Sequence, residues 1–450
     1  MSEFMKYYLI EFFCGCGVTS RGFIRSGSFN VILRNDVKKE ALRTFDHNHR
    51  NEVIKPEVIL EDIRKLDISI IENVLKEKGI NKGQLDCMIG GPPCQGFSQL
   101  RRSEYRDQDN MLTFGGYSKL SEDPRNDLVL RYLEIAAALR PKVLVIENVP
   151  QMLSHGFQGR LGKLSEIVIN ILEKDLGYTV EVAKVNAADY GVPQLRERAF
   201  FIASLVGKVS FPRPKHTDPK NKKLIEKGLL PWVTVHDAIG DLPSPSIKEN
   251  FSDLNKMESD FDRGENSYLK EMRTSKNLPL HHVTRKYNDN IVDIIRHMRP
   301  GETWVSESNR MRKAYDDLVE KLVREKELSY SDAKDELIRN GVINPAFYKD
   351  YYWSAYTRLA WDQPALTITA NSNFLGSGRF THPVENRGIT MREAARLQSF
   401  DDDFEFITSD TGKTRIGVGM DMIGEAVPPL LSKAIANHIA TVLDSAKNQK

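Results

Sequence analysis

Short apolar runs alternate with segments of helical periodicity through the first part of the chain, up to about residue 204. Apolar runs bounded by polar residues are typical of buried strands, and apolar positions three or four residues apart are typical of helices. This alternation predicts an α/β fold, with a mostly parallel sheet wrapped by helices. The predicted strands are 8–13, 30–34, 87–89, 143–146, 179–185 and 199–202, and the predicted helices are 39–47, 69–78, 128–139 and 164–175.

The pattern changes near residue 206, where proline-rich connectors and lysine-rich polar stretches replace the strands and helices. A strongly charged segment over 315–339 has helical character, and such a segment is by default a solvated helix. Aromatic and basic residues interleave over 348–358, which is typical either of a duplex-contacting surface or of an aromatic mini-core. An apolar helical pattern over 430–443 is suited to docking on a core. The chain therefore predicts two domains.

Composition supports this interpretation and narrows it. A length of 450 residues favours two domains, and 40% hydrophobic with 28% charged residues is typical of a globular protein in water. The formal net charge is only +2, so a nucleic-acid partner would require positive charge to be concentrated on one face. No apolar run approaches the roughly 18 residues of a membrane helix, and the amino terminus shows no secretory signal, so we expect a cytoplasmic protein.

The four cysteines argue against two kinds of site. Cys14, Cys16, Cys87 and Cys94 all lie in the first hundred residues, which is no disulfide framework and indicates a reducing compartment. The one-residue spacing of Cys14 and Cys16 fits no zinc pattern, so we expect no metal.

Residues 90–98 read Gly-Gly-Pro-Pro-Cys-Gln-Gly-Phe-Ser and follow the predicted strand 87–89. A thiol at the carboxyl end of a strand lies where open α/β sheets bind ligands, and the prolines and glycines around it shape a turn rather than a core. Most free cysteines are small buried residues, but this setting favours Cys94 as a nucleophile. Glu147 follows the predicted strand 143–146, so its carboxyl group is expected at the same edge of the sheet, facing the thiol.

Residues 11–17 read Glu-Phe-Phe-Cys-Gly-Cys-Gly and predict a strand that runs into a glycine turn and a helix amino terminus. Such a turn lets the backbone approach a ligand closely, although a plain tight turn explains it equally well. Asp36 follows the second predicted strand, where an acid can hold a pair of ribose hydroxyls, and Asp62 follows a third apolar patch. These residues alone do not separate a nicotinamide cofactor from S-adenosylmethionine.

Together these motifs resemble those of the cytosine carbon-5 DNA methyltransferases of bacterial and phage restriction–modification systems. The string at 90–98 is almost the signature of that family, and Gln194-Leu-Arg-Glu-Arg198 matches its Gln-x-Arg-x-Arg motif. The resemblance implies a Rossmann-like S-adenosylmethionine-dependent methyltransferase domain over 1–205, a smaller target-recognition domain that reads DNA over 206–388, and a hinge with return to the catalytic domain over 389–450.

The resemblance also implies residue roles. Cys94 would add to carbon 6 of a flipped-out cytosine while Glu147 assists at ring nitrogen 3. Arg198 would hold the cytosine carbonyl, and Arg196 would support the cysteine loop or a phosphate. The residues implied to bind S-adenosylmethionine, and its product S-adenosylhomocysteine, are Phe13, Gly15, Cys16, Gly17, Asp36, Val37, Asp62, Ile63, Pro93, Leu128, Glu425 and Val427. Those implied to contact DNA are Gln95, Ser98, Arg101, Arg358, Thr367 and Thr369.

One motif departs from the family. The usual Gly-Asn-Ala-Val-Pro reads Gly424-Glu-Ala-Val-Pro428 here, so an anion replaces a neutral amide. The resemblance further implies double-stranded DNA as partner, a cognate restriction endonuclease acting separately, no membrane, a monomeric state, and a location in the bacterial cytoplasm or nucleoid, or in a phage-infected cell.

Three alternatives stay open. A tRNA cytosine-5 methyltransferase shares the fold but typically reads Cys-Phe-Thr after the prolines, so the Cys94-Gln-Gly-Phe-Ser98 string favours DNA. A catalytically silent DNA-binding homologue would not need an intact Cys94, Glu147 and Arg198. An NAD-dependent oxidoreductase would explain the glycine turn alone.

Overall fold

The computed structural model describes residues 7–50, 52, 54–93, 127–153, 163–247, 265–273, 280–409 and 415–448. The chain divides into two compact units, one formed by Met1–Val192, Arg196–Pro231 and Ala426–Lys450, the other by Pro193–Leu195 and Trp232–Glu425. These bounds differ from the predicted domain limits in three places. Residues 206–231 lie in the first unit, and residues 193–195 and 389–425 lie in the second.

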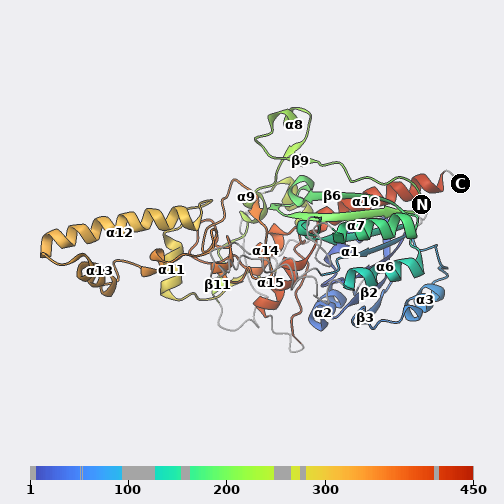
Figure 1. Ribbon diagram of the computed structural model, residues 1–450, viewed down its shortest axis with the longest axis horizontal. Coiled ribbons are helices and arrows are strands. Elements are labelled where there is room, and N and C mark those ends of the chain that lie inside the picture. Colours follow the sequence, from blue (N-terminus) through green and yellow to red (C-terminus); the bar gives the residue numbers. More distant parts are fainter. Residues whose placement is uncertain are drawn as a thin grey trace, which may run out of the picture. The chain divides into compact units, whose positions relative to one another are not determined.

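A mostly parallel seven-stranded sheet forms the centre of the first unit (Figure 1). The strand order is β3-β2-β1-β4-β5-β8-β6, and only β8 runs antiparallel to its neighbours. The predicted α/β fold is thereby confirmed. The strands are β1 (Tyr7–Phe12), β2 (Phe29–Asp36), β3 (Glu57–Leu60), β4 (Cys87–Gly90), β5 (Val143–Asn148), β6 (Thr179–Asn186) and β8 (Glu197–Ser204).

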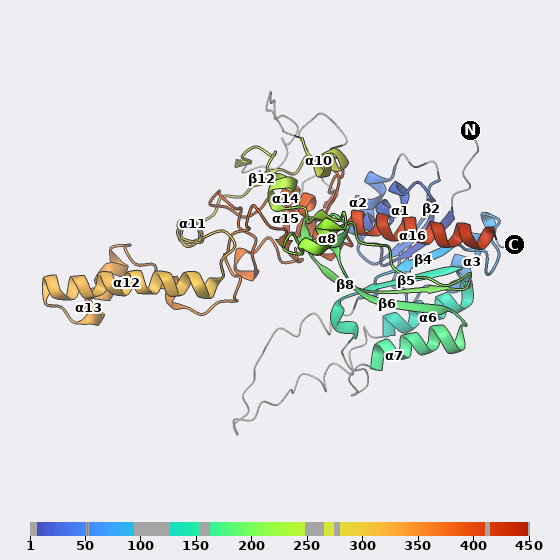
Figure 2. The same cartoon turned by 90° about the horizontal axis from the view of Figure 1, so that it is seen from above.

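Helices cover both faces of this sheet, as Figure 2 shows. Alternate side chains of each strand point to opposite faces, so Ile10 packs with α3, α6 and α7, whereas Leu9 packs with α1 and α16. The helices are α1 (Val18–Arg25), α2 (Lys39–Asn48), α3 (Ile68–Glu77), α6 (Asp127–Leu139), α7 (Lys163–Asn170) and α16 (Pro429–Lys447). Shorter elements of this unit are η2 (Pro150–Leu153), the π-helical turn η3 (Ile171–Asp175), η4 (Ala187–Tyr190), β9 (His216–Thr217), α8 (Lys222–Glu226) and β10 (Leu230–Pro231).

The second unit is mainly helical, with short strand pairs. Its helices are α9 (Val235–Ile239), α10 (Ser267–Met272), α11 (Asp289–Arg296), α12 (Trp304–Lys326), α13 (Tyr330–Arg339), α14 (Met391–Leu397) and α15 (Ile416–Glu425). Its strands are β7 (Gln194–Leu195), β11 (Ser246–Ile247), β12 (Val283–Thr284) and β13 (Ala365–Leu366), and its 3-10 turns are η5 (Pro345–Tyr348) and η6 (Leu375–Ser377). In neither unit do the described residues include a helix both long enough and apolar enough to cross a membrane.

The charged segment predicted as one helix over 315–339 is two helices. Glu327 adopts a left-handed φ of 53° that ends α12, and the side chain of Ser329 accepts a hydrogen bond from the backbone of Asp332 to begin α13. One face of α12 is also buried rather than solvated, because Trp304 and Tyr315 lie in the core of this region.

The interleaved aromatic segment forms a mini-core rather than a continuous surface. The rings of Trp304 and Phe347 stack with centroids 5.5 Å apart, and Tyr351 packs edge-on against Tyr356 at 5.4 Å. Of the aromatic residues in 348–358, Tyr352 and Trp353 remain exposed. The second of the two interpretations of this segment therefore describes most of it.

Candidate active site

The loop that leads to Cys94 runs against the end of β5. The side-chain amide of Asn148 donates a hydrogen bond to the carbonyl of Pro92 over 2.9 Å. A Cβ atom added to Gly91 would lie 3.0 Å from Oε2 of Glu147, so glycine lets the backbone pass close to that carboxyl group. The loop is thus anchored beside Glu147 up to Pro93. Four predicted site residues lie outside the described residues: Cys94, Gln95, Ser98 and Arg101.

Glu147 forms an ion pair with Arg198 at this edge. Oε1 of Glu147 lies 3.0 Å from Nε of Arg198, and each side chain is only 14% exposed. Glu197 points the other way and pairs with Lys184 at 2.9 Å, so the alternation along β8 turns Arg198 toward Glu147. Arg196 is buried and its charge also acts on Glu147.

Burial controls the protonation of this cluster. Burial raises the pKa of Glu147, while the charges of Arg198 and Arg196 oppose that rise. Burial likewise lowers the pKa of both guanidinium groups. A raised pKa favours the protonated carboxyl group, which is the form that a general acid requires.

Gln194, which begins the Gln-x-Arg-x-Arg motif, and Thr367 make hydrogen bonds within the second unit. Gln194 is fully buried: its amide donates to the carbonyl of Leu397 at 3.1 Å, and its oxygen accepts from the backbone of Ile368 at 3.0 Å. The hydroxyl of Thr367 donates to the carbonyl of Leu195 at 2.9 Å. The hydroxyl of Thr369 is buried and makes no hydrogen bond to any described residue.

The glycine turn follows β1 and opens α1. The amide of Gly15 donates to Oδ2 of Asp36 at 2.8 Å, which ties the turn to the end of β2. Gly15 has a φ of 53°, and a Cβ there would meet no atom within 4 Å, so its outer side is open. Gly17 has a φ of 78°, and a Cβ there would lie 2.3 Å from the ring of Phe45. Phe13 also adopts a left-handed φ, 54°, a strained conformation that is common at functional sites.

The ends of β2 and β3 provide groups that fit an adenosine moiety. Asp36 accepts one backbone hydrogen bond at each oxygen, from Gly15 and from Lys38 at 2.9 Å, which leaves each oxygen a lone pair for a ribose hydroxyl. Val37 is 60% exposed, and Leu60, the register partner of Asp36, is 51% exposed. Exposed apolar side chains beside a carboxylate suit the face of a base and its sugar.

Other predicted cofactor residues are less available. The carboxylate of Asp62 is bound by the guanidinium of Arg64, with Nε 3.0 Å from Oδ1, and this hydrogen bond lowers the pKa of Asp62. The side chains of four others are buried, namely Cys16, Ile63, Leu128 and Val427. Glu425 is exposed at the end of α15, in the second unit. Among the described residues, no group of three His, Cys, Asp or Glu side chains could hold a metal ion.

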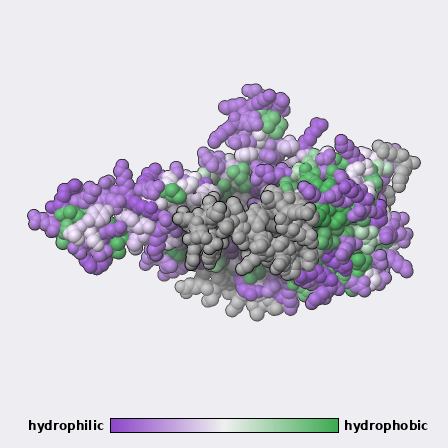
Figure 3. Space-filling view, in the orientation of Figure 1, coloured by the Kyte–Doolittle hydropathy of each residue, from purple (hydrophilic) through white to green (hydrophobic). Residues whose placement is uncertain are grey.

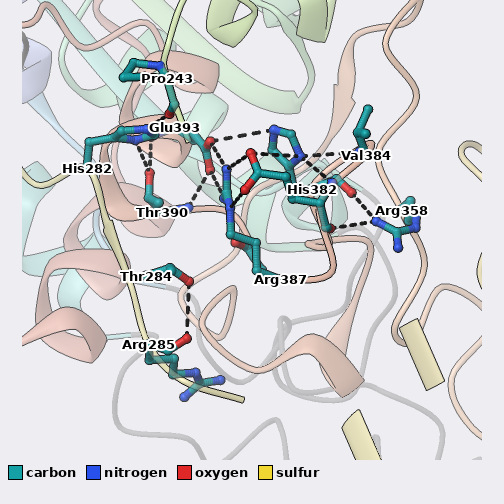
Figure 4. A network of polar contacts seen from close by, with 12 residues as sticks. Pro243, His282, Thr284, Arg285, Arg358, His382, Val384, Arg387, Thr390 and Glu393 are labelled. Carbon is teal, nitrogen blue, oxygen red and sulfur yellow. Dashed lines mark hydrogen bonds and ion pairs between the residues drawn. The ribbon is translucent and has the colours of Figure 1, made fainter. Parts of the chain in front are cut away.

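Arg358, predicted to contact DNA, is buried and bonded within the second unit. Nε of the guanidinium group donates to the carbonyl of Met298 at 3.0 Å, and a terminal nitrogen donates to the carbonyl of Glu385 at 2.7 Å. The same terminal nitrogen donates to the carbonyl of His382 at 2.9 Å (Figure 4). Arg358 is only 4% exposed. Its hydrogen bonds hold loops of the second unit together.

The comparison with known families decides the assignment. The family model described as C-5 cytosine-specific DNA methylase matches residues 7–441. The chain belongs to this family. Membership makes it a DNA (cytosine-5)-methyltransferase. Its sheet and helices form the S-adenosylmethionine-dependent methyltransferase fold.

Similar proteins match this chain over nearly its whole length. The type II methyltransferase M.AgeI of Thalassovita gelatinovora is 28% identical, covering 96% of this chain and 99% of that protein. M.DdeI of Desulfomicrobium norvegicum is 30% identical, covering 96% of this chain and 88% of that protein. A crystal structure described as an E. coli prophage-encoded DNA modification methyltransferase superposes with a TM-score of 0.64 at 21% identity, covering 98% of this chain and 100% of that one, and so shares the fold.

Two parts of this site were not expected from the sequence. Asn148, next to Glu147, holds the cysteine loop through Pro92, and Gly91 makes room for the carboxyl group of Glu147. Gly91 lies within the 90–98 string, and Asn148 follows Glu147 directly. A polar residue at a strand end beside a catalytic candidate is the signal that could have identified Asn148.

Proposed function

We propose that this chain methylates carbon 5 of a flipped-out cytosine in duplex DNA, with Cys94 as nucleophile and Glu147 as the acid at ring nitrogen 3. The observation that carries the proposal is the buried Glu147–Arg198 pair, packed against the Gly91–Pro92 loop that leads directly to Cys94. A base inside a duplex cannot reach such a site, so the target nucleotide must leave the helix.

Carbon 5 of cytosine is a poor nucleophile, and the proposed residues address that difficulty. The Cys94 thiolate forms a bond to carbon 6, and the electrons of the 5,6 double bond move through the ring toward nitrogen 3. Protonated Glu147 donates to that nitrogen and neutralises the charge, while Arg198 holds the ring carbonyl. After methylation, carbon 5 loses its proton to a base, the carbon–sulfur bond breaks, the proton at nitrogen 3 returns to Glu147, and 5-methylcytosine leaves with the thiolate restored.

S-adenosylmethionine, when bound, supplies the methyl group from its sulfonium and becomes S-adenosylhomocysteine. Gly15 would let the backbone approach it, Asp36 would accept its ribose hydroxyls, and Val37 would cover its base. The open side of Gly15 and the remaining lone pairs of Asp36 support this fit. Phe13, Gly17, Asp62 and Pro93 would complete the pocket.

We further propose a setting for the reaction. The relatives named as type II methyltransferases match this chain over nearly their full length. This supports a bacterial restriction–modification role, in which the chain works as a cytoplasmic monomer and a separate endonuclease cuts unmethylated sites.

The first test measures transfer of label from tritiated S-adenosylmethionine to mixed-sequence duplex DNA, to total tRNA, and without nucleic acid. Label in DNA that is lost in Cys94→Ser is the expected result, and mapping the 5-methylcytosines then gives the recognition sequence. Label in tRNA alone would replace the proposal with the RNA enzyme. Cofactor binding without any transfer would identify a catalytically silent homologue.

A second test asks whether Cys94 forms the covalent bond. DNA containing 5-fluorocytosine cannot lose a proton from carbon 5, so the adduct accumulates and survives denaturing electrophoresis. We expect the adduct with wild type and with the control Cys87→Ala, whose cysteine is buried on β4, but not with Cys94→Ala. An adduct in Cys94→Ala would assign the nucleophile elsewhere.

A further inference from the structure

The strongest concentration of positive charge in the first unit is an exposed segment that we call the basic arm, residues 213–231. It comprises β9, α8 and β10 and stands out from the body of its unit (Figure 1). It carries six cations, Arg213, Lys215, Lys220, Lys222, Lys223 and Lys227, against the two acids Asp218 and Glu226, a balance of +4. The whole chain has a net charge of only +2, so the residues outside the arm are together slightly negative.

The cations of the arm are not neutralised by acids among the described residues. Within the described part of the chain, none of the six forms an ion pair, and all are exposed. Charged helix α12 differs: Lys321 pairs with Glu325 at 3.8 Å, and Lys326 pairs with Glu336 at 2.6 Å. The surface of the arm is mainly hydrophilic in Figure 3, so it offers charge rather than an apolar docking face. Unpaired exposed lysines fit a polyanion.

The root of the arm lies at the catalytic edge of the sheet. The end of β6 and the start of β8 lie beside the end of β5, because Asn186 pairs with Glu197 and Asn148 with Ala199. Turn η4 therefore leaves the sheet at the same edge as Glu147. The arm is fixed to that turn, because the backbone of Lys215 donates to the carbonyl of Asp189 at 3.0 Å.

Two further contacts define this root. The hydroxyl of Tyr190 donates to the carbonyl of Pro212 at 2.8 Å. A Cβ added to Gly191 would lie 3.0 Å from the ring of His216, so glycine is needed for the close packing of arm and turn. The amide of Leu230 then donates to the carbonyl of Lys215 at 2.9 Å and closes the arm at its base. Several hydrogen bonds thus fix the base of the arm beside the catalytic edge of the sheet.

We propose that the basic arm binds the phosphate backbone of duplex DNA that flanks the target cytosine, and so supplies much of the salt-dependent affinity for the substrate. This rests on the proposed function, which brings a duplex to the same edge of the sheet. Phosphate contacts of this kind position DNA without reading its sequence. The arm would therefore act alike on every sequence.

The test compares Lys220→Ala/Lys222→Ala/Lys223→Ala with a matched control, Lys76→Ala/Lys78→Ala/Lys82→Ala. The control removes the same charge from the same unit, at the end of α3 and the loop before β4, which lies at the opposite edge of the sheet. Binding of a fluorescent mixed-sequence duplex is followed by anisotropy as salt is varied. Each lost phosphate contact lowers the slope of log affinity against log salt by about 0.9, so the arm variant should be shallower by about 2 to 3.

The affinity ratio of wild type to arm variant should therefore shrink by at least about tenfold between about 50 and 200 mM salt, while the control follows wild type. Lys220→Arg/Lys222→Arg/Lys223→Arg should keep the wild-type slope, and unchanged S-adenosylhomocysteine affinity shows that the alanine variant is folded. An arm variant with the slope of wild type, or an effect on tRNA alone, would overturn the proposal. A different outcome would reject the proposed function instead: the wild type binds DNA through the arm but transfers no methyl group to it.

Discussion

A buried ion pair beneath the glycine turn gives the sharpest prediction about stability. Glu11 on β1 and Arg34 on β2 are 2% and 0% exposed, with Oε2 and Nε 3.6 Å apart. The Cζ atom of Arg34 lies 3.5 Å above the ring of Phe45, and none of its guanidinium nitrogens forms a hydrogen bond to a described residue. Arg34 thus compensates a buried carboxylate by charge alone.

The perturbation is Arg34→Met, and its cost should depend on pH. Burial raises the pKa of Glu11 from 4.5 to about 7, against the attraction of Arg34. At about 1.4 kcal/mol per pKa unit, ionised Glu11 already costs about 3 kcal/mol in the fold. A pKa raised by folding contributes stability that is complete below pH 4.5 and is lost as pH rises through about 7. Without Arg34 the pKa of Glu11 rises further, so the loss continues to higher pH.

We expect Arg34→Met to lower the free energy of unfolding of the first unit by about 3–5 kcal/mol at about pH 8.5, and by less at about pH 6. The double variant Arg34→Met/Glu11→Gln should recover much of this loss and remove its pH dependence. Hydrogen exchange in peptides spanning β1 and β2 measures the effect locally. All four tryptophans lie in the second unit, so a fluorescence unfolding curve provides the internal control. Parallel pH profiles for Arg34→Met and wild type would refute the reasoning.

Three further predictions follow from single contacts. Glu147→Gln should lower kcat by about 10²- to 10⁴-fold, and the fall in wild-type rate as pH rises through the raised pKa of Glu147 should disappear from the pH–rate profile of the variant. Gly17→Ala should lower the free energy of unfolding by about 2–3 kcal/mol, and Gly15→Ala by about 1 kcal/mol. Both positions have a positive φ, but only at Gly17 would the added methyl group meet the ring of Phe45. Equal losses of stability by calorimetry would contradict this. Arg358→Met should destabilise the second unit by about 3 kcal/mol in urea unfolding followed by tryptophan fluorescence, with no change in the salt slope of DNA binding, whereas a shallower slope would restore its DNA role.

Hydrophobic patterning predicted the inner strands of the sheet because they are buried on both faces. Strand 143–146 and helix 128–139 have nearly continuous apolar runs, and both are buried as expected. Strand β3 was missed because it lies at the edge of the sheet, with only partly buried or exposed residues and no long apolar run. The break between α12 and α13 was missed because a glutamate, rather than a glycine, adopts the left-handed conformation at 327.

The site was predictable where its chemistry is local and not where it depends on contacts between distant segments. The Glu147 position followed from one rule, that strand ends gather at one edge. Its pairing with Arg198 depends on the antiparallel register of β8, which no local pattern specifies. The internal bonds of Arg358 could not be predicted for the same reason, because its partners at Met298, His382 and Glu385 lie far from it in sequence.

The distribution of charge explains how a nearly neutral chain can act on DNA. The cations at the heart of the first unit, Arg34 and Arg198, each face a buried carboxylate, so they have little field to offer a duplex approaching from solvent. The lysines of the basic arm form no ion pair with any residue that the structure describes, and they lie in water, where a phosphate can replace their counterions. Affinity and chemistry would then reside in different residues. Salt should accordingly weaken DNA binding steeply while leaving the Glu147 step in the bound complex almost unchanged, and single-turnover rates at saturating DNA would reveal any coupling between the two.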